Sequence, residues 1–350
     1  MNLVPTIRIR PARADDLDAL LLLAERAGTG FTNLPRDAAV LAARIERSAT
    51  LLDMAHPAAG ATDEAGEPKL GGAIILVIEI DGRVRGCGMV FPRIGVEWPF
   101  YSYRISYTTQ RSSLDGRMTR FAVLTLTNDL EEYAEVGGLV IDPELRRGGY
   151  GRAMARSRYL FMGCHRAMFG ARVIADLRGW LDPNGNSPFW DAVGGRFYAM
   201  SFAEADHINA TSGNQFIADL GPRAPIPVNM LSEAAQAAIG RVHDDGRAAQ
   251  ALLIEEGFRD EGYVDIFDAG PTMIADIDAL KAIRARRSAI FVRSDSGDAL
   301  HDHLIAHGRG RDFCCTVGSV EAAGGQAVTD PGGAALLGLA EGAPISWLAL

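Results

Sequence analysis

Hydrophobic and polar residues in the first third of the chain follow a strand period and a helix period in turn. Residues 6–10 alternate apolar and charged side chains, which predicts a first strand. Leucines at helical spacing predict a helix over 16–27, and a second helix is expected over about 37–51. Two apolar runs, 73–80 and 84–91, flank an Asp-Gly dipeptide that favours a tight turn, so they are expected to pair as a hairpin.

The middle of the chain continues with short strands and one long helix. A strand is expected over 101–107, and the apolar stretch 136–141 predicts another. A long helix-like segment follows over about 152–169. A strand over 172–180 and a short helix over 187–193 complete this part.

The last part of the chain has weaker patterns. A helix is expected over 247–256 and a strand over 263–267. The intervening residues 199–242 are too many for one loop, so they are expected to form added elements or part of a second half. After about residue 289 the Gly/Ala-rich sequence carries short strand signals, typical of a small β-rich appendage. We therefore expect three parts: 1–198, 199–288 and 289–350.

The turn between the strand at 136–141 and the following helix is basic and rich in glycine. The first N–H groups of a helix lack partners, and the helix dipole adds positive potential there, so such a turn binds anions. Its spacing differs from the glycine patterns of dinucleotide and ATP sites. The expected anion cradle consists of Arg146, Arg147, Gly149, Tyr150 and Gly151.

Composition narrows the possible partners. The chain has 350 residues and a formal net charge of −9, which argues against a general affinity for nucleic acid or for an anionic membrane. Its four cysteines show no C-x-x-C spacing. With no signal peptide and no apolar run near 18 residues, the sequence predicts a cytoplasmic protein.

The basic turn is similar to the pyrophosphate-binding turn of the GNAT superfamily of N-acyltransferases, which hold coenzyme A. The predicted order of elements also matches the GNAT plan. The resemblance implies an α/β (α+β) fold with a mixed, largely antiparallel sheet flanked by helices, and with added C-terminal elements.

Shared blocks make the resemblance more specific. Eight of them occur in one order over about residues 6–285: 28–35 (G-x-G-x-T-x-L-P), 98–104 (W-P-x-Y-x-Y-R), 128–129 (N-D), 176–179 (D-L-R-G), 187–190 (S-P-F-W), 196–197 (R-F), 239–243 (I-G-x-V-H) and 265–272 (D-I-F-D-x-G-P-T). They resemble the arginine N-succinyltransferase family. The resemblance implies transfer of a succinyl group from succinyl-CoA to the α-amine of L-arginine, the entry step of arginine breakdown through succinylated intermediates. It implies succinyl-CoA as a substrate, and no permanently bound cofactor.

The resemblance also implies roles for two residues. His243 matches the family's proton donor, and Leu139 matches a leucine that contacts succinyl-CoA, where strand backbone groups can pair with the pantetheine amides. Taken alone, a histidine before two aspartates is more often a helix-end residue than a catalyst, whereas a histidine near neutral pKa can also take one proton and give another. The chain departs from the family at 136–138, where a Val-Gly-Gly run replaces polar residues and could alter the acyl pocket.

An arginine substrate needs partners for three charged groups. Its guanidinium needs a carboxylate, for which Asp176, Asp129 and Glu135 are candidates. The two carboxylates, of arginine and of the succinyl group, need a cation or N–H groups, for which Arg104 and Arg178 are candidates. Thr32 lies in the 28–35 turn, where GNAT enzymes receive the acceptor.

Other functions stay open from the sequence. A GNAT acetyltransferase of another small amine would use the same turn, and a chain of this family could also serve as a subunit of an arginine/ornithine succinyltransferase or as a non-catalytic partner. The sequence leaves open a homo- or hetero-oligomer. His301, His303 and His307 have a spacing that suggests a metal site, but a solvated surface is the preferred interpretation, and no metal is expected.

Overall fold

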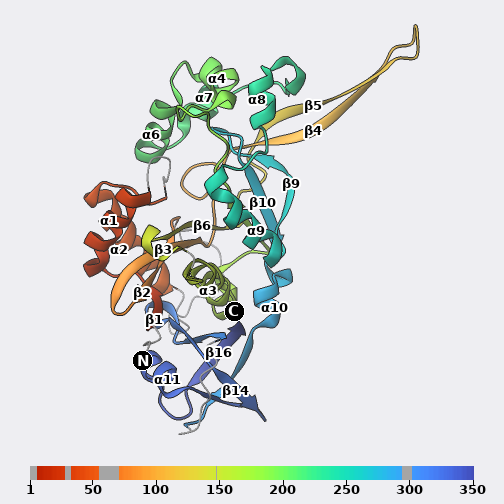
Figure 1. Ribbon diagram of the computed structural model, residues 1–350. Helices are drawn as coiled ribbons and strands as arrows, with labels where there is room; N and C mark the ends of the chain where they lie inside the picture. Colours follow the sequence, from red (N-terminus) through yellow and green to blue (C-terminus); the bar gives the residue numbers. More distant parts are fainter. Residues whose placement is uncertain (1–5, 28–32, 55–70, 147, 294–301) are drawn as a thin grey trace. The chain divides into compact units, whose positions relative to one another are not determined.

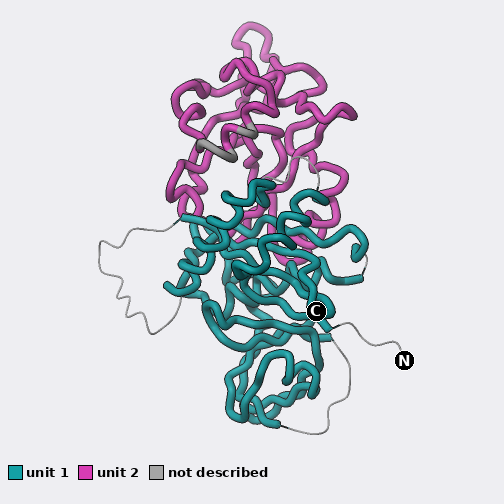
Figure 2. Tube along the Cα trace, turned by 90° about the vertical axis from the view of Figure 1, so that its left-hand side faces the viewer, with its two compact units in different colours: residues 1–93, 134–172, 276–350 teal, residues 94–133, 173–275 magenta. Residues whose placement is uncertain are grey.

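The computed structural model describes residues 6–27, 33–54, 71–146, 148–293 and 302–350 (Figure 1). They form two compact units, each assembled from separate stretches of the chain (Figure 2). Unit 1 comprises Met1–Arg93, Ala134–Arg172 and Asp276–Leu350, and unit 2 comprises Ile94–Tyr133 and Val173–Ala275. The division at residues 198 and 288 stays a prediction.

The first half of unit 1 is an antiparallel sheet with helices on both faces. Its strands and helices are β1 (Ile7–Pro11), β2 (Ile74–Ile80), β3 (Arg83–Phe91), β6 (Ala134–Ile141), α1 (Leu17–Ala27), α2 (Ala38–Met54) and α3 (Tyr150–Cys164). Cys87 and Met89 of β3 belong to the core formed with α1 and α2. Gly88, on the opposite side of the strand, faces Met154 and Arg158 of α3. Because the sheet is covered on both faces, β2 is a nearly continuous apolar run.

The second half of unit 1 extends the same sheet. Its elements are β11 (Arg287–Phe291), β12 (His303–His307), β13 (Cys314–Gly318), β14 (Val320–Ala323), β15 (Gln326–Thr329), β16 (Pro344–Ala349), α10 (Lys281–Ala285) and α11 (Pro331–Leu337). The strand order is β14-β15-β11-β16-β12-β13-β1, so the C-terminal strands join the N-terminal sheet through β13 and β1. β11 and β15 pair in parallel.

Unit 2 contains antiparallel strand pairs and helices around an aromatic core. Its elements are β4 (Ser102–Arg111), β5 (Met118–Thr127), β7 (Arg172–Asp176), β8 (Ile226–Pro227), β9 (Arg259–Val264), β10 (Pro271–Asp276), α4 (Pro188–Ala192), α5 (Gly194–Tyr198), α6 (Phe202–Ser212), α7 (Gln215–Leu220), α8 (Glu233–Ala238) and α9 (Arg247–Glu256). The strand order is β7-β10-β9-β4-β5-β8. Trp190 is fully buried and stacks between Tyr198 and Phe267, with ring centroids 5.5 Å and 5.4 Å away.

The predicted fold class, a mixed α/β fold with a largely antiparallel sheet flanked by helices, is confirmed. Several details differ from the sequence-based expectation, among them the strand expected over 172–180, which ends at Asp176. The strand expected over 263–267 lies at Arg259–Val264, because the chain already turns at Asp265, whose carboxylate accepts hydrogen bonds from two following N–H groups. Strand β5, the second strand of the hairpin that begins with β4, was not predicted from the sequence. No helix in the described ranges is long and apolar enough to span a bilayer.

His165 lies buried in unit 1 at the end of α3. Its Nδ1 donates to the Phe161 carbonyl oxygen at 3.0 Å, and its Nε2 accepts the Gly310 N–H at 2.9 Å. The ring stacks on Phe161. These contacts suit the neutral ring only, because a second ring proton would face the Gly310 N–H. Burial lowers the pKa of His165 to about 4.

A pH-dependent stability follows from His165. In the unfolded chain the ring titrates near 6.5, so its contribution to stability is fully present above about pH 6.5 and is lost as the pH falls toward 4. We expect wild type to lose about 2–3 kcal/mol more unfolding free energy than His165→Gln between pH 7 and pH 4.5. Urea titrations at both pH values measure this difference, and equal losses in the two proteins would contradict it.

Candidate functional site

The basic turn lies in unit 1, between β6 and α3. Gly149 adopts a φ of 78° and precedes the first residue of the helix, a conformation that favours glycine. The first bond of the helix runs from Ala153 N–H to Gly149 O, at 3.0 Å. The N–H groups of Tyr150 and Gly151 therefore have no acceptor within the helix. A Cβ at Gly151 would come no closer than 4.0 Å to Ile141, so the backbone there is open to a ligand.

Asp142 fixes the start of this turn. Its buried carboxylate accepts hydrogen bonds from Arg26 Nη1 of α1 at 2.7 Å and from Arg85 Nε of β3 at 3.1 Å. The same side chain accepts the Glu144 N–H at 3.2 Å and caps a short 3-10 helix, Pro143–Leu145. Helix α1 and strand β3 thus hold the turn in place, while Arg146 remains exposed. Arg147 lies outside the described residues.

Strand β6 carries a bulge just before the turn. Met89 pairs with Gly137 and Cys87 with Val140, so Gly138 and Leu139 together oppose Gly88. Gly138 has a φ of 56°, and a Cβ there would meet Met89 at 2.8 Å. Gly138 of the Val-Gly-Gly run is therefore required by the bulge. Leu139, the second residue of the bulge, is half-buried.

Arg158 of α3 is a buried cation that the sequence analysis missed. Its guanidinium donates to the Gly137 carbonyl oxygen at 3.1 Å and so holds the bulge. Burial lowers the pKa of Arg158, and the nearby Tyr159, Cys87 and Glu135 oppose that shift. A single arginine on a helix gives no sequence signal that its side chain is turned inward.

His243 lies in unit 2, on a loop at the start of a short 3-10 helix, Asp244–Gly246. Its backbone N–H donates to the Arg178 carbonyl oxygen at 2.8 Å. Its Nδ1 accepts the Asp245 N–H at 3.2 Å. Because Nδ1 accepts, the ring proton of the neutral form lies on Nε2, which is left to donate. The side chain is 24% exposed.

The His243 loop is fastened to a second loop through Asp268. Gly179 forms an isolated antiparallel bridge with Val242, next to the Arg178–His243 bond. The Asp268 carboxylate accepts the Gly179 N–H at 2.7 Å and the Gly270 N–H at 2.8 Å. Gly179 has no space for a side chain, since a Cβ would meet the Asp268 carbonyl oxygen at 2.3 Å. The 265–272 block thus positions the loop that carries His243.

Three carboxylates gather behind this loop. Burial raises the pKa of Asp265 well above its usual range, and the charges of Asp268 and Asp176 raise it further. Burial also raises the pKa of Asp268. Burial raises the pKa of Asp176 to about 6, although Thr272 Oγ1 donates to its carboxylate at 2.5 Å. A bound cation would stabilise the charged form of Asp176, which keeps this residue a candidate partner for a guanidinium.

Two other candidates lie together in unit 2. Arg104 approaches Asp129 at 3.5 Å, and Tyr263 donates to the same carboxylate at 3.1 Å. Both Arg104 and Asp129 are more than 40% exposed, so a substrate ion could exchange with either partner. Arg178 lies close enough to Asp268 to lower the pKa of that carboxyl. Thr32 lies outside the described residues, and Glu135 belongs to unit 1.

The sequence comparisons decide the family. A family model described as the arginine N-succinyltransferase beta subunit matches residues 7–282, and one for its C-terminal domain matches residues 289–349. The chain belongs to the arginine N-succinyltransferase beta subunit family. It is similar to the arginine N-succinyltransferase subunit beta of Pseudomonas aeruginosa, with 36% identity over 96% of each chain.

Further relatives agree with this family. The chain is 39% identical to an arginine N-succinyltransferase of Salmonella schwarzengrund, over 80% of this chain and 78% of the relative. A solved structure of arginine/ornithine succinyltransferase subunit AI from Pseudomonas aeruginosa superposes with a TM-score of 0.83, at 29% identity and 99% coverage of both chains. The residues matched by the two family models therefore include both units and the C-terminal strands β11–β16.

Cys87 and Cys164 of this family member do not offer a nucleophile. Burial raises the pKa of Cys87 to about 12, and burial also raises the pKa of Cys164. Thiols that stay protonated at neutral pH are poor nucleophiles. This agrees with direct transfer without an acyl-enzyme.

The other histidines named in the sequence analysis have structural partners. His303 bonds to Asp302 at 2.6 Å, and His307 bonds to the Pro344 carbonyl oxygen at 2.9 Å. His301 lies outside the described residues. Within the described ranges no group of three or more potential ligands could hold a metal ion.

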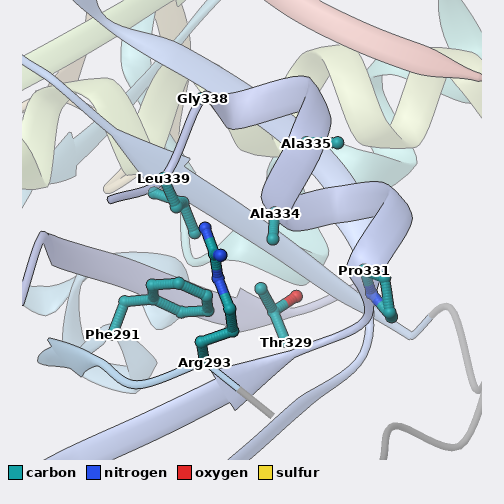
Figure 3. A pocket seen from close by; sticks show the side chains of 8 residues that line it. All are labelled: Phe291, Arg293, Thr329, Pro331, Ala334, Ala335, Gly338 and Leu339. Carbon is teal, nitrogen blue, oxygen red and sulfur yellow. The ribbon is translucent and has the colours of Figure 1, made fainter. Parts of the chain in front are cut away.

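A hollow of about 260 Å³ lies among the C-terminal elements of unit 1, between α11 and the strands β11 and β15 (Figure 3). Phe291 and Leu339 line it, with Arg293 at the side. None of the residues predicted for the site from the sequence lines it. It is therefore not the acyl-transfer site indicated by the family.

Proposed function

We propose that this chain transfers the succinyl group of succinyl-CoA to the α-amine of L-arginine, giving CoA and N2-succinyl-L-arginine. The observation that carries the proposal is the family match over residues 7–282 and 289–349. Succinyl-CoA is then a substrate and no cofactor stays bound. The reaction would take place in the cytoplasm, as the first step of arginine breakdown.

In the proposed reaction the unprotonated amine attacks the thioester carbonyl carbon. A C–N bond forms, the C–S bond breaks, the nitrogen gives up a proton and the leaving thiolate gains one. His243 supports this step, since its Nε2 carries a proton while Nδ1 is held by the Asp245 N–H. No acyl-enzyme is needed, because the thioester is already activated.

The donor is proposed to lie on the unit 1 turn. The N–H groups of Tyr150 and Gly151 at the start of α3 and the exposed Arg146 suit the CoA pyrophosphate, with Gly149 giving the backbone its open conformation. Arg147 is expected to add charge. The bulge at Leu139 supports a backbone contact with the pantetheine arm, because its backbone is out of register with β3.

The acceptor is proposed to bind in unit 2, close to His243. Asp176 offers a buried carboxylate that accepts the Thr272 hydroxyl, and Asp129 offers one that already pairs with Arg104. Arg104 and Arg178 are proposed for the carboxylates of arginine and of the succinyl group. Thr32 is proposed as a further acceptor contact.

A thiol-release assay tests the reaction. Purified chain is offered succinyl-CoA or acetyl-CoA together with arginine, ornithine or lysine, and reactions without amine give the background. We expect the fastest CoA release with succinyl-CoA and arginine. No release with succinyl-CoA and either arginine or ornithine would contradict the proposal. Faster release with acetyl-CoA would favour an acetyltransferase instead.

A second candidate is a subunit of a larger arginine/ornithine succinyltransferase. It is favoured by two relatives whose names describe them as subunits. In that case the purified chain would release CoA only after a second, related chain is added. The thiol-release assay separates these two candidates when it is run first with this chain alone, because only an enzyme active by itself would then release CoA.

A further inference from the structure

The hairpin formed by β4 and β5 extends beyond the rest of unit 2 (Figure 1). Its strands pair over their whole length, from Ser102 and Thr127 to Arg111 and Met118. The connecting turn is closed by backbone bonds, Ser112 N–H to Arg117 O at 2.8 Å and Gly116 N–H to Ser112 O at 3.1 Å. The hairpin is therefore an ordered ribbon rather than a loose loop.

Neighbouring strands support only the base of this ribbon. β9 pairs with β4 at Tyr103 and Arg104, and β8 pairs with β5 at Val123 and Leu124. Beyond these positions, within the described chain, no strand pairs with the outer edges of the hairpin. We call residues 105–122 the arm. Unpaired strand edges offer backbone donors and acceptors to another chain.

An apolar face continues from the core onto the arm. At the base, Tyr103 and Leu124 are buried in the unit 2 core. Side chains alternate along a strand, so Tyr107 lies on the same face of the hairpin as Tyr103. Met118 pairs with Arg111, which also lies on that face, so Met118 belongs to it as well. Tyr107 and Met118 are each 63% exposed, and Leu114 at the tip is 95% exposed. A bare two-stranded ribbon is only marginally stable in water, so this face needs cover.

The charge of the arm is opposite to that of the rest of the chain. The arm contains three arginines and one aspartate, a net of +2, whereas the whole chain carries −9 and the remainder therefore −11. Arg120 lies over the Tyr107 ring at 4.7 Å, so its charge is held beside the apolar face. The remainder of a second copy of this chain, with its net charge of −11, is complementary in charge to the arm.

We propose that the arm docks onto a second copy of this chain, so that two copies exchange arms in a symmetric dimer. Each copy then covers the apolar face and the open edges of the other. The arm contains none of the residues proposed for acyl transfer, so the inference goes beyond the proposed function. Association is measured without substrate, and its failure would leave the proposed reaction untouched.

Sedimentation equilibrium of the full chain tests the arm. We expect wild type at twice the protomer mass at 50 µM, with a dissociation constant that rises with ionic strength, because opposite charges are screened (about 10 Å range at 0.1 M salt). Tyr107→Glu/Met118→Glu should raise that constant at least tenfold. The matched control, Ile254→Glu, replaces an exposed residue of α9 in the same unit and should leave it unchanged.

Hydrogen exchange gives a second measurement on the same proteins. Amides of residues 105–122 should exchange more slowly in wild type at concentrations where it dimerises, and should not do so in the double variant. Three results would overturn the proposal: a wild-type monomer at 100 µM, a double variant that dimerises like wild type, or association with a different chain only.

Discussion

Replacing His243 by alanine is expected to lower turnover by a factor of about 10²–10⁴, because general acid–base assistance of the thiolate and the amine is lost. The Michaelis constant for succinyl-CoA should change little, since the proposed CoA turn belongs to unit 1 and His243 to unit 2. Steady-state kinetics with succinyl-CoA and arginine measures both quantities. An unchanged turnover would show that another group moves the protons.

Two further variants separate proton transfer from loop structure. His243→Asn keeps an acceptor for the Asp245 N–H through its amide oxygen but lacks Nε2. It should be as slow as the alanine variant while keeping wild-type stability. His307→Asn, on β12 of unit 1, serves as the matched histidine control and should keep full activity.

Asp268→Ala should produce the second largest effect. Two buried N–H groups, of Gly179 and Gly270, lose their acceptor, at roughly 1–3 kcal/mol each. The first of these belongs to the segment that holds the His243 backbone. We expect lower stability and a turnover reduced by about tenfold or more, with the Michaelis constant for succinyl-CoA little changed. Thermal unfolding and steady-state kinetics provide the measurements.

Conservative variants test whether Asp268 acts by positioning. Asp268→Asn can accept only one of the two N–H groups well, because its NH₂ group cannot accept, so an intermediate loss is expected. Asp265→Asn is the matched control: a single oxygen of Asp265 accepts both the Phe267 and the Asp268 N–H groups, and an amide can replace it. Equal losses in these two variants would mean that Asp268 has no special role in holding His243.

The parts that sequence predicts best depend on local chemistry. The strand, basic turn and helix around Arg146–Gly151 follow from glycine, charge and periodicity within about thirty residues, and the structure places β6 and α3 there. His243 was found only through the family resemblance. Nothing in its neighbourhood predicts that Nδ1 would be held by the Asp245 N–H and leave the proton on Nε2.

Features that depend on distant contacts were missed. Asp268 reaches Gly179 across 89 positions, and such a contact is set by the pairing of two loops rather than by either sequence. Arg158 reads as an ordinary helix residue, although its partner is the carbonyl oxygen of a bulge. Strand β5 has polar and charged residues toward its tip, because the hairpin leaves the core there and both faces meet solvent.

The pairing of β1 with β13 has a consequence for synthesis. The Thr316 hydroxyl donates to the Ile7 carbonyl oxygen 309 positions earlier. During synthesis, one edge of β1 therefore stays unpaired until β13 has been made. At about 5–20 residues per second, a ribosome needs roughly 15–60 s to supply it. Through that interval one edge of the N-terminal sheet stays open to other nascent chains. Unit 2 ends at Ala275 in the sequence, so all of its residues are synthesised before β13.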